Sequence, residues 1–270
     1  MKTKNHFISL AVISLITFMA TFFAITPAQA QFRIGSDGLE FDLEDNKKPV
    51  QASTIVMAKK NSLNIGRRNF STIPCFEIGW NIISNANYGL YEGMGVGEFF
   101  DIRNWKSTQV TVNLLQASAA NRSRTLGVGI GLGIRSNDYR LAHNQSIERT
   151  TGIVMPYEIG LSGKGRSPKK SKFNVASLHI PVEVFFGKPN KFAFSVGGYV
   201  DMVMNSHTKI KYYGGQKEKV HNFPTNFIQA GAVARLTFSN ISVFASYQPT
   251  SIFKSSRGPE LQQWTIGIAL

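Results

Sequence analysis

Eight segments of the chain alternate strictly between apolar side chains and small or polar ones, and this period of two constrains the fold more than any other feature. In the run 126–134, for example, branched apolar residues alternate with four glycines. Alternation over such lengths is typical of β-strands and not of helices. The predicted strands span 74–83, 107–117, 124–136, 175–186, 191–205, 226–238, 241–253 and 261–270.

The lengths of these strands and of the gaps between them indicate a barrel that crosses a membrane. Most of the segments have ten or more residues, whereas a globular strand has about five or six and a membrane-crossing strand needs about nine to eleven. Bacterial barrels have an even number of strands, with short turns at one end and long loops at the other. The gaps are alternately long and short: 84–106, 118–123, 137–174, 187–190, 206–225, 239–240 and 254–260.

We therefore predict an all-β fold, an eight-stranded antiparallel transmembrane β-barrel, over residues 70–270. A closed barrel pairs every backbone group, which lipid requires, and eight strands leave an interior just wide enough for side chains. The apolar face of each strand is then expected to face hydrocarbon. Representative residues of this face are Trp80, Leu132, Val182, Leu236 and Ile266.

The first 30 residues have the pattern of a secretory signal peptide. Lys2 and Lys4 precede an apolar run over 7–25, and Ala28-Gln29-Ala30 provides a small-residue cleavage site. An uncleaved membrane anchor is the alternative, which the small residues disfavour. Export of a barrel predicts the bacterial outer membrane as its location.

Residues 31–69 lie outside the alternating pattern and mix acidic with basic clusters. We expect a flexible periplasmic N-terminal arm there, with an additional strand or a plug as the alternatives.

Composition limits the partners and the chemistry. Charged residues make up only 17% of the chain, yet the formal net charge is +14, and an excess of basic residues favours an anionic partner. Export argues against nucleic acid, so outer-membrane lipid and lipopolysaccharide are the expected anions. The single cysteine, Cys75, excludes an intramolecular disulfide and a cysteine-clustered metal site. We expect no cofactor and no metal.

Several stretches resemble PorT-like outer-membrane β-barrel proteins. They are the strand 174–187 with its Ile180-Pro181 core, Gly197-Gly198-Tyr199-Val200 followed by Lys209 and Lys211, the run 229–232, the Ser239-Asn240 turn, the run 247–252 and the final strand with Gly267. The resemblance implies the same barrel fold and, from the family's namesake, assistance to protein secretion. The chain departs from the usual terminal Phe of bacterial barrels by ending in Leu270, which is still apolar, and we expect recognition by the barrel-assembly machinery.

Six ionisable residues fall on the inward face by parity: Glu77, Arg135, His179, Glu183, Asp201 and Arg235. A buried ion is costly unless it is paired, so we predict a salt-bridged lumen network, with a proton-transfer or catalytic role as the alternative. His179 and Glu183 do not suit one metal ion, because four residues of a strand span about 13 Å.

The predicted loop 137–174 is basic, and so is 206–225. Contact with an anionic surface is one interpretation, and solvation of long loops is the other. The candidate contact residues are Lys164, Arg166, Lys169, Lys170 and Lys172.

Two further strand features carry local predictions. The glycine repeat at 127–133 has neither dinucleotide-binding nor Walker spacing, so we expect these glycines to make room for large side chains across the lumen. Pro181 lies within a strand, where a missing N–H predicts a bulge.

No catalytic set can be assembled from the sequence, although Ser206 and His207 are adjacent near a predicted rim. We expect a small, non-enzymatic outer-membrane barrel with basic extracellular loops and a structural, adhesive or surface-assembly role, the last with a protein partner. The alternatives are an outer-membrane lipid-modifying hydrolase, which needs a rim Ser–His pair, and a narrow solute pore, which needs an open lumen.

Overall fold

The computed structural model describes residues 73–270 except 122, 124, 143–144, 160–167, 189–190, 214 and 240, together with the backbone of 30–35, 38–43 and 53–57. The predicted signal peptide lies almost wholly outside the described residues.

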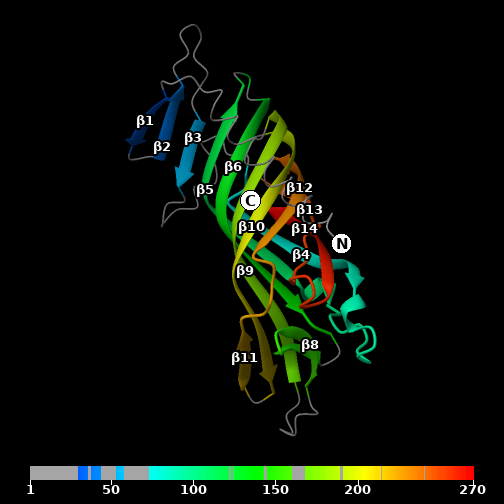
Figure 1. The fold of residues 1–270 in the computed structure, drawn as a ribbon. Coiled ribbons are helices and arrows are strands. Elements are labelled where there is room, and N and C mark those ends of the chain that lie inside the picture. The colour runs from blue at the N-terminus through cyan, green and yellow to red at the C-terminus, as the bar shows by residue number, and fades with distance from the viewer. Residues whose placement is uncertain are drawn as a thin grey trace.

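Eight antiparallel strands close into a ring, as the sequence predicts (Figure 1). Each strand pairs with the next one around the ring, and the last, β14, pairs with the first, β4, so that the ring itself has no open edge. The strands of the barrel are β4 (Phe76–Asn87), β5 (Thr108–Ala120), β6 (Leu126–Arg140), β9 (Pro168–Lys188), β10 (Phe192–Tyr212), β12 (Ile228–Phe238), β13 (Ile241–Gln248) and β14 (Glu260–Ala269).

Short elements at one end of the barrel extend it beyond the ring. The hairpin of β7 (Gln145–Thr150) and β8 (Ile153–Glu158) lies there with β11 (Lys217–His221), which pairs with β10. Two 3-10 turns, η1 (Gly89–Tyr91) and η2 (Asn104–Lys106), belong to the connection between β4 and β5. Among the described residues, no helix is long and apolar enough to cross a membrane.

Three strands precede the barrel in the segment predicted to be a flexible arm. They are β1 (Ala30–Gly35), β2 (Gly38–Leu43) and β3 (Ser53–Met57), which form an antiparallel meander. β3 also pairs with β5 at Gln116 and Leu115. These three stretches are therefore strands, which was the alternative considered for this segment. A periplasmic position of the segment stays a prediction.

Side-chain polarity is inverted relative to a soluble protein. The inward residues of the barrel include buried Glu, Arg, Gln and Thr, whereas large apolar residues cover the outer wall. The five residues predicted to face hydrocarbon all have the outward parity of their strands. The outward apolar residues, here called the apolar belt, are Ile78, Trp80, Ile82, Val110, Val112, Leu114, Leu126, Val128, Ile130, Leu132, Ile134, Leu178, Ile180, Val182, Val184, Phe186, Phe192, Phe194, Val196, Val200, Met202, Ile228, Leu236, Phe238, Ile241, Val243, Trp264, Ile266 and Ile268.

The apolar belt ends at matching levels on neighbouring strands. On β6 the outward residue after Ile134 is Ser136, which pairs with Ala176 of β9, and Ala176 in turn pairs with Asn205 of β10. An aromatic pair marks the same edge on β13 and β14, where the rings of Tyr247 and Trp264 stack at 4.6 Å. Aromatic residues at the margins of an apolar band are typical of membrane barrels.

The strands β9 and β10 are longer than their alternating patterns predict, because both continue past the edge of the belt for several residues. The expectation that Lys169, Lys170 and Lys172 lie in a loop is therefore wrong, since all three belong to β9. A bulge between Val203 and Asn205 shifts the register of β10 against β9. It exchanges the two faces of β10, so residues with odd numbers face outward beyond it.

The predicted bulge at Pro181 is absent. Pro181 pairs with Tyr199 of β10 without a register shift. Towards β6 the ladder lacks pairs between Ile130–Val182 and Gly133–His179, but the register is the same on both sides of the gap. A Cβ atom on Gly131 would lie 3.0 Å from Cγ of Pro181, so the glycine gives the proline ring room within a regular strand.

The apolar belt predicts that Val182→Arg prevents folding in a bilayer. A midplane arginine on a lipid-facing position costs about 2–4 kcal/mol. Folding into phosphatidylcholine liposomes, measured as the heat-modifiable band on a gel, is expected to fall sharply. The matched control is Val220→Arg on β11, outside the belt, which keeps the folded band. Equal folding of both variants would contradict the assignment of the belt.

Candidate functional site

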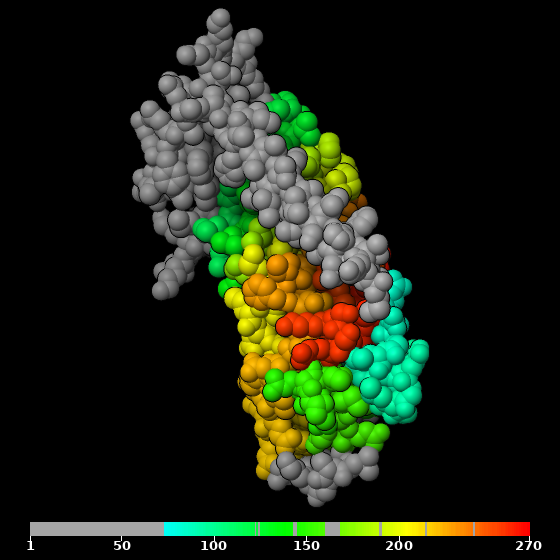
Figure 2. All heavy atoms as spheres, viewed as in Figure 1, coloured from blue at the N-terminus to red at the C-terminus, as the bar shows by residue number. Residues whose placement is uncertain are grey.

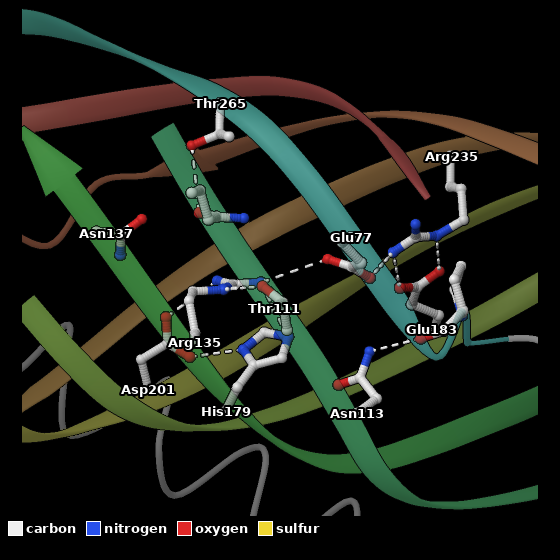
Figure 3. A network of polar contacts seen from close by, with 12 residues as sticks. Glu77, Thr111, Asn113, Arg135, Asn137, His179, Glu183, Asp201, Arg235 and Thr265 are labelled. Atoms are coloured by element: carbon white, nitrogen blue, oxygen red, sulfur yellow. Dashed lines mark hydrogen bonds and ion pairs between the residues drawn. The ribbon is translucent and has the colours of Figure 1, made fainter. Parts of the chain in front are cut away.

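The six ionisable residues predicted for the lumen lie together inside the barrel. They come from β4, β6, β9, β10 and β12, and each residue is at most 3% exposed. Figure 3 shows their side chains converging from opposite walls. The contacts divide into two groups, one centred on Arg235 and the other on Arg135.

Arg235 joins two carboxylates that lie on different strands. Its Nε and Nη2 donate to the two carboxylate oxygens of Glu183 at 3.2 and 3.0 Å, and Nη2 also donates to Glu77 at 2.8 Å. Ser195 donates to Glu183 at 2.6 Å. The guanidinium lies over the ring of Phe244, 5.2 Å from its centroid. Two-point contact of this kind fixes geometry as well as charge.

Arg135 organises the second group. It donates to Asp201 at 3.0 Å and to Thr111 at 3.1 Å, and its guanidinium lies 4.3 Å from the ring centroid of Tyr199. A contact of 4.0 Å between Arg135 and Glu77 connects the two groups. The six residues therefore form one continuous network.

The partners of His179 determine its protonation. Nη2 of Arg135 lies 2.9 Å from Nε2 of the imidazole, and Asp201 lies 2.6 Å from Nδ1. A guanidinium can only donate, so Nε2 accepts and Nδ1 carries the proton donated to Asp201. His179 is thus neutral, and the network holds two guanidinium groups against three carboxyl groups.

Several lumen residues that complete this network were not singled out from the sequence. Tyr199, Ser195 and Thr111 supply the ring and hydroxyl groups, and parity on their strands is the signal that identifies them. A layer of buried polar side chains lies along the lumen beside them: Asn81, Gln109, Asn137, Gln229, Gln248, Gln263 and Thr265.

Glycines on the lumen face make room for large side chains of the adjacent strand, whereas the prediction for 127–133 was room for side chains across the lumen. A Cβ on Gly127 would lie 2.5 Å from the ring of Phe185. On β12, a Cβ on Gly231 would meet the ring of Tyr199 at the same distance. Each ring belongs to the residue that pairs with the glycine on the adjacent strand, so these glycines fit large side chains beside them along the barrel wall.

An apolar cluster, here called the apolar cap, fills the barrel beyond the network at the end that carries β7, β8 and β11. Phe173 lies near its centre, with ring centroids of Phe100, Phe223 and Phe253 within 5.3–5.9 Å. Burial raises the pKa of Tyr91, a member of the cap, to about 12. The buried residues of the cap are Tyr91, Phe99, Phe100, Ile102, Tyr139, Leu141, Ile147, Val154, Phe173, Val175, Val203, Phe223, Ile252, Phe253 and Leu261.

The candidate contacts with an anionic surface are dispersed. Lys164 and Arg166 lie outside the described residues. Lys169 is exposed, with its ammonium 5.8 Å from the ring of Tyr213, and Lys172 forms an ion pair of 2.6 Å with Asp138. Lys170 and Lys172 share the outward face of β9, two residues apart.

The adjacent residues Ser206 and His207 do not form a catalytic pair. Ser206 points inward, where its hydroxyl bonds the backbone of Phe223. His207 points outward and stacks on His221 at 5.2 Å. Neighbouring residues of a strand face opposite sides, which accounts for the separation. Within the described part of the chain, no group of three or more His, Cys, Asp or Glu residues is placed to hold a metal ion.

Comparisons with known proteins identify no family. No protein-family description matches the chain, and no curated protein does, so the resemblance to PorT-like barrels stays a prediction. Among solved structures, the attachment invasion locus protein Ail of Yersinia pestis is similar over 72% of this chain and 93% of its own, with 12% identity and a TM-score of 0.31.

The lumen network predicts that Arg235→Met is strongly destabilising. Removal of the guanidinium leaves Glu77 and Glu183 buried beside each other without a cation, and breaking a buried pair costs about 3–5 kcal/mol. The free energy of unfolding, measured in urea with the barrel in liposomes, should fall by that order. The triple variant Arg235→Met/Glu77→Gln/Glu183→Gln should recover much of the loss. Arg103→Met, at an exposed position, is the control and should have little effect; no recovery in the triple variant would contradict the pairing.

Proposed function

We propose that this chain is a small outer-membrane barrel that holds its outer end at the cell surface and acts there in structure, adhesion or surface assembly. The observation that carries the proposal is the inverted polarity of the barrel wall. Soluble proteins rarely expose large continuous apolar patches, yet the apolar belt runs across all eight strands while paired charges occupy the interior. Hydrocarbon around the barrel accounts for both.

The dimensions of the belt support a membrane position. On β6 it runs from Leu126 to Ile134 and on β9 from Leu178 to Phe186. Nine residues rise about 30 Å along a strand. A strand tilted by 35–45° then covers roughly 21–25 Å, close to the height of about 25 Å of the apolar band of bacterial barrels.

We infer a role other than transport from the way the lumen is filled. The network of Arg135 and Arg235 crosses the interior at one level, and the apolar cap fills it at another. A pore needs a continuous polar path, whereas the cap residues that the structure describes are buried apolar side chains packed against one another. A lipid-modifying hydrolase is disfavoured for a separate reason: Ser206 and His207 face opposite sides of β10 and cannot act as a catalytic pair.

The proposed topology predicts which end of the barrel faces outward. In a Cys75→Ser background, Lys217→Cys on β11 should react with a membrane-impermeant maleimide on whole cells. Lys188→Cys, at the opposite end of β9, should react only after the outer membrane is permeabilised. Both positions are exposed, so the difference reports sidedness. Labelling of Lys188→Cys alone on whole cells would reverse the topology, and labelling of neither in any membrane fraction would contradict the location.

The filled lumen predicts that the barrel does not conduct ions. Purified protein in a planar lipid bilayer should give no stable conductance steps, because the charges are paired and the cap excludes water. A porin measured in the same bilayer is the control. Large, stable steps that scale with the amount of protein would favour the pore alternative.

A further inference from the structure

Six lysines form two rows across three strands at the outer end of the barrel. Lys209 of β10 pairs with Lys172 of β9 on one side and with Lys219 of β11 on the other. One row further out, the same arrangement places Lys170, Lys211 and Lys217 opposite one another. These six residues, here called the lysine grid, share one face, since they are two residues apart on every strand. Figure 2 shows β11 and the adjoining end of β10, in gold, at the lower edge of the molecular surface.

The lysine grid faces away from the protein core. The opposite face of the same strands carries Ile210 and Tyr212, which pack with Ile159 after the β7–β8 hairpin. Glu218 of β11 also lies on that face and accepts a hydrogen bond from Tyr212. The inner face of β10 and β11 is therefore packed against the rest of the protein, and the lysine grid forms the outer face of these strands beyond the barrel.

Like charges directly opposite each other on neighbouring strands are destabilising, so the folded protein does not benefit from these rows. Asp138 of β6 lies beside the grid and pairs with Lys172. Burial lowers the pKa of Lys170, and the neighbouring Lys172, Arg140 and Lys211 lower it further. A counter-ion outside the chain would relieve this repulsion.

Protection of an edge strand explains only part of the grid. Lysines on an edge discourage pairing with another chain, and β11 is such an edge, so Lys217 and Lys219 fit that role. β10 has partners on both sides at this level. Lys209 and Lys211 therefore lie in the middle of the sheet, where no edge needs protection.

The height and direction of the grid indicate what it meets. It continues the lipid-facing wall of β9 beyond Ala176, so it faces the layer beside the barrel and not the space above it. At about 3.3 Å per residue and about 40° of tilt, Lys172 and Lys170 stand roughly 10 and 15 Å above the edge of the belt. Phospholipid headgroups fill only about 5–7 Å per leaflet. The anions at this height are those carried on larger, phosphorylated saccharides.

From this placement we propose that the lysine grid binds the phosphate groups of lipopolysaccharide in the leaflet that surrounds the barrel. The inference rests on the proposed outer-membrane location, and it deepens the proposed function by naming a lipid partner and the residues that bind it. Lys209 and Lys211 are the central contacts, since each has a lysine on both sides.

The test compares Lys209→Gln/Lys211→Gln with Lys188→Gln/Lys191→Gln. The second pair removes the same charge at the opposite end of the barrel, where both lysines are exposed. Each protein, immobilised as the folded barrel in dodecyl maltoside, is titrated with lipopolysaccharide, with dephosphorylated lipopolysaccharide and with phosphatidylglycerol. Bound ligand is measured at low and high salt.

The grid variant should bind lipopolysaccharide roughly 30-fold more weakly, since each lysine at an anionic surface contributes a factor of about five. The control pair should bind as the unmodified protein does, and high salt or dephosphorylation should remove the difference. Equal binding by both variants, or equal binding of phosphatidylglycerol and lipopolysaccharide, would overturn the proposal. The proposal would also be overturned if the purified barrel bound lipopolysaccharide only after a second protein was added.

Folding controls separate this proposal from the proposed function. In phosphatidylcholine liposomes the grid variant should fold at least as well as the unmodified protein, because lysine–lysine repulsion is removed. If it does not fold, the single variant Lys211→Gln supports the proposal by a roughly five-fold loss of affinity and overturns it by unchanged affinity. Failure of the unmodified protein to insert into any bilayer would contradict the outer-membrane function, whereas normal insertion with unchanged lipopolysaccharide affinity contradicts the grid alone.

Discussion

The pairing of β14 with β4 is the contact on which the rest of the structure depends. It runs from Glu260 opposite Asn87 to Ala269 opposite Glu77, and two backbone hydrogen bonds of 3.0 and 2.8 Å between Phe76 and Leu270 complete its end. In hydrocarbon an unpaired N–H or C=O group has no water to bond, so an open sheet edge is not tolerated. Once this seam is closed, the outer wall can be apolar throughout, and every polar side chain of the belt region must turn inward.

The narrow interior then makes the inward charges depend on one another. Glu77 lies on a seam strand and receives Arg235 from β12 across the lumen, while Arg135 reaches Asp201 and also approaches Glu77. A charge without such a partner would be strongly disfavoured there. Closure brings the walls within reach, and the ion pairs hold the walls together, so the seam and the network stabilise the same state.

The alternating pattern allowed the eight strands, the antiparallel barrel and the inward face to be predicted, because each of these depends only on residue parity and gap length. Residue parity also identified Glu77, Arg135 and the other four lumen residues. Parity does not survive a bulge, and the one at Val203–Asn205 reverses the outward face of β10. The lysine grid depends on the register between three strands, and the apolar cap depends on how the loops pack. Neither could be predicted from the alternation of residues within one strand.

A single strand shows why the two ends of the barrel differ. Near one end of β9, Glu183 is buried inside and Val182 faces outward; near the other, Phe173 is buried inside and Lys172 faces outward. The strand keeps its period of two while the polarity of its faces is exchanged. At the level of Phe173 the outer wall faces water, so the apolar side chain lies inside. At the level of Val182 hydrocarbon replaces that water, so the apolar side chain lies outside. The exchange occurs around Ala176, so the residues of β9 themselves mark where the hydrocarbon ends. Beyond that level the outer wall faces water, and any polar side chain would suit it. Core packing therefore does not explain why lysines stand directly opposite one another on β9, β10 and β11.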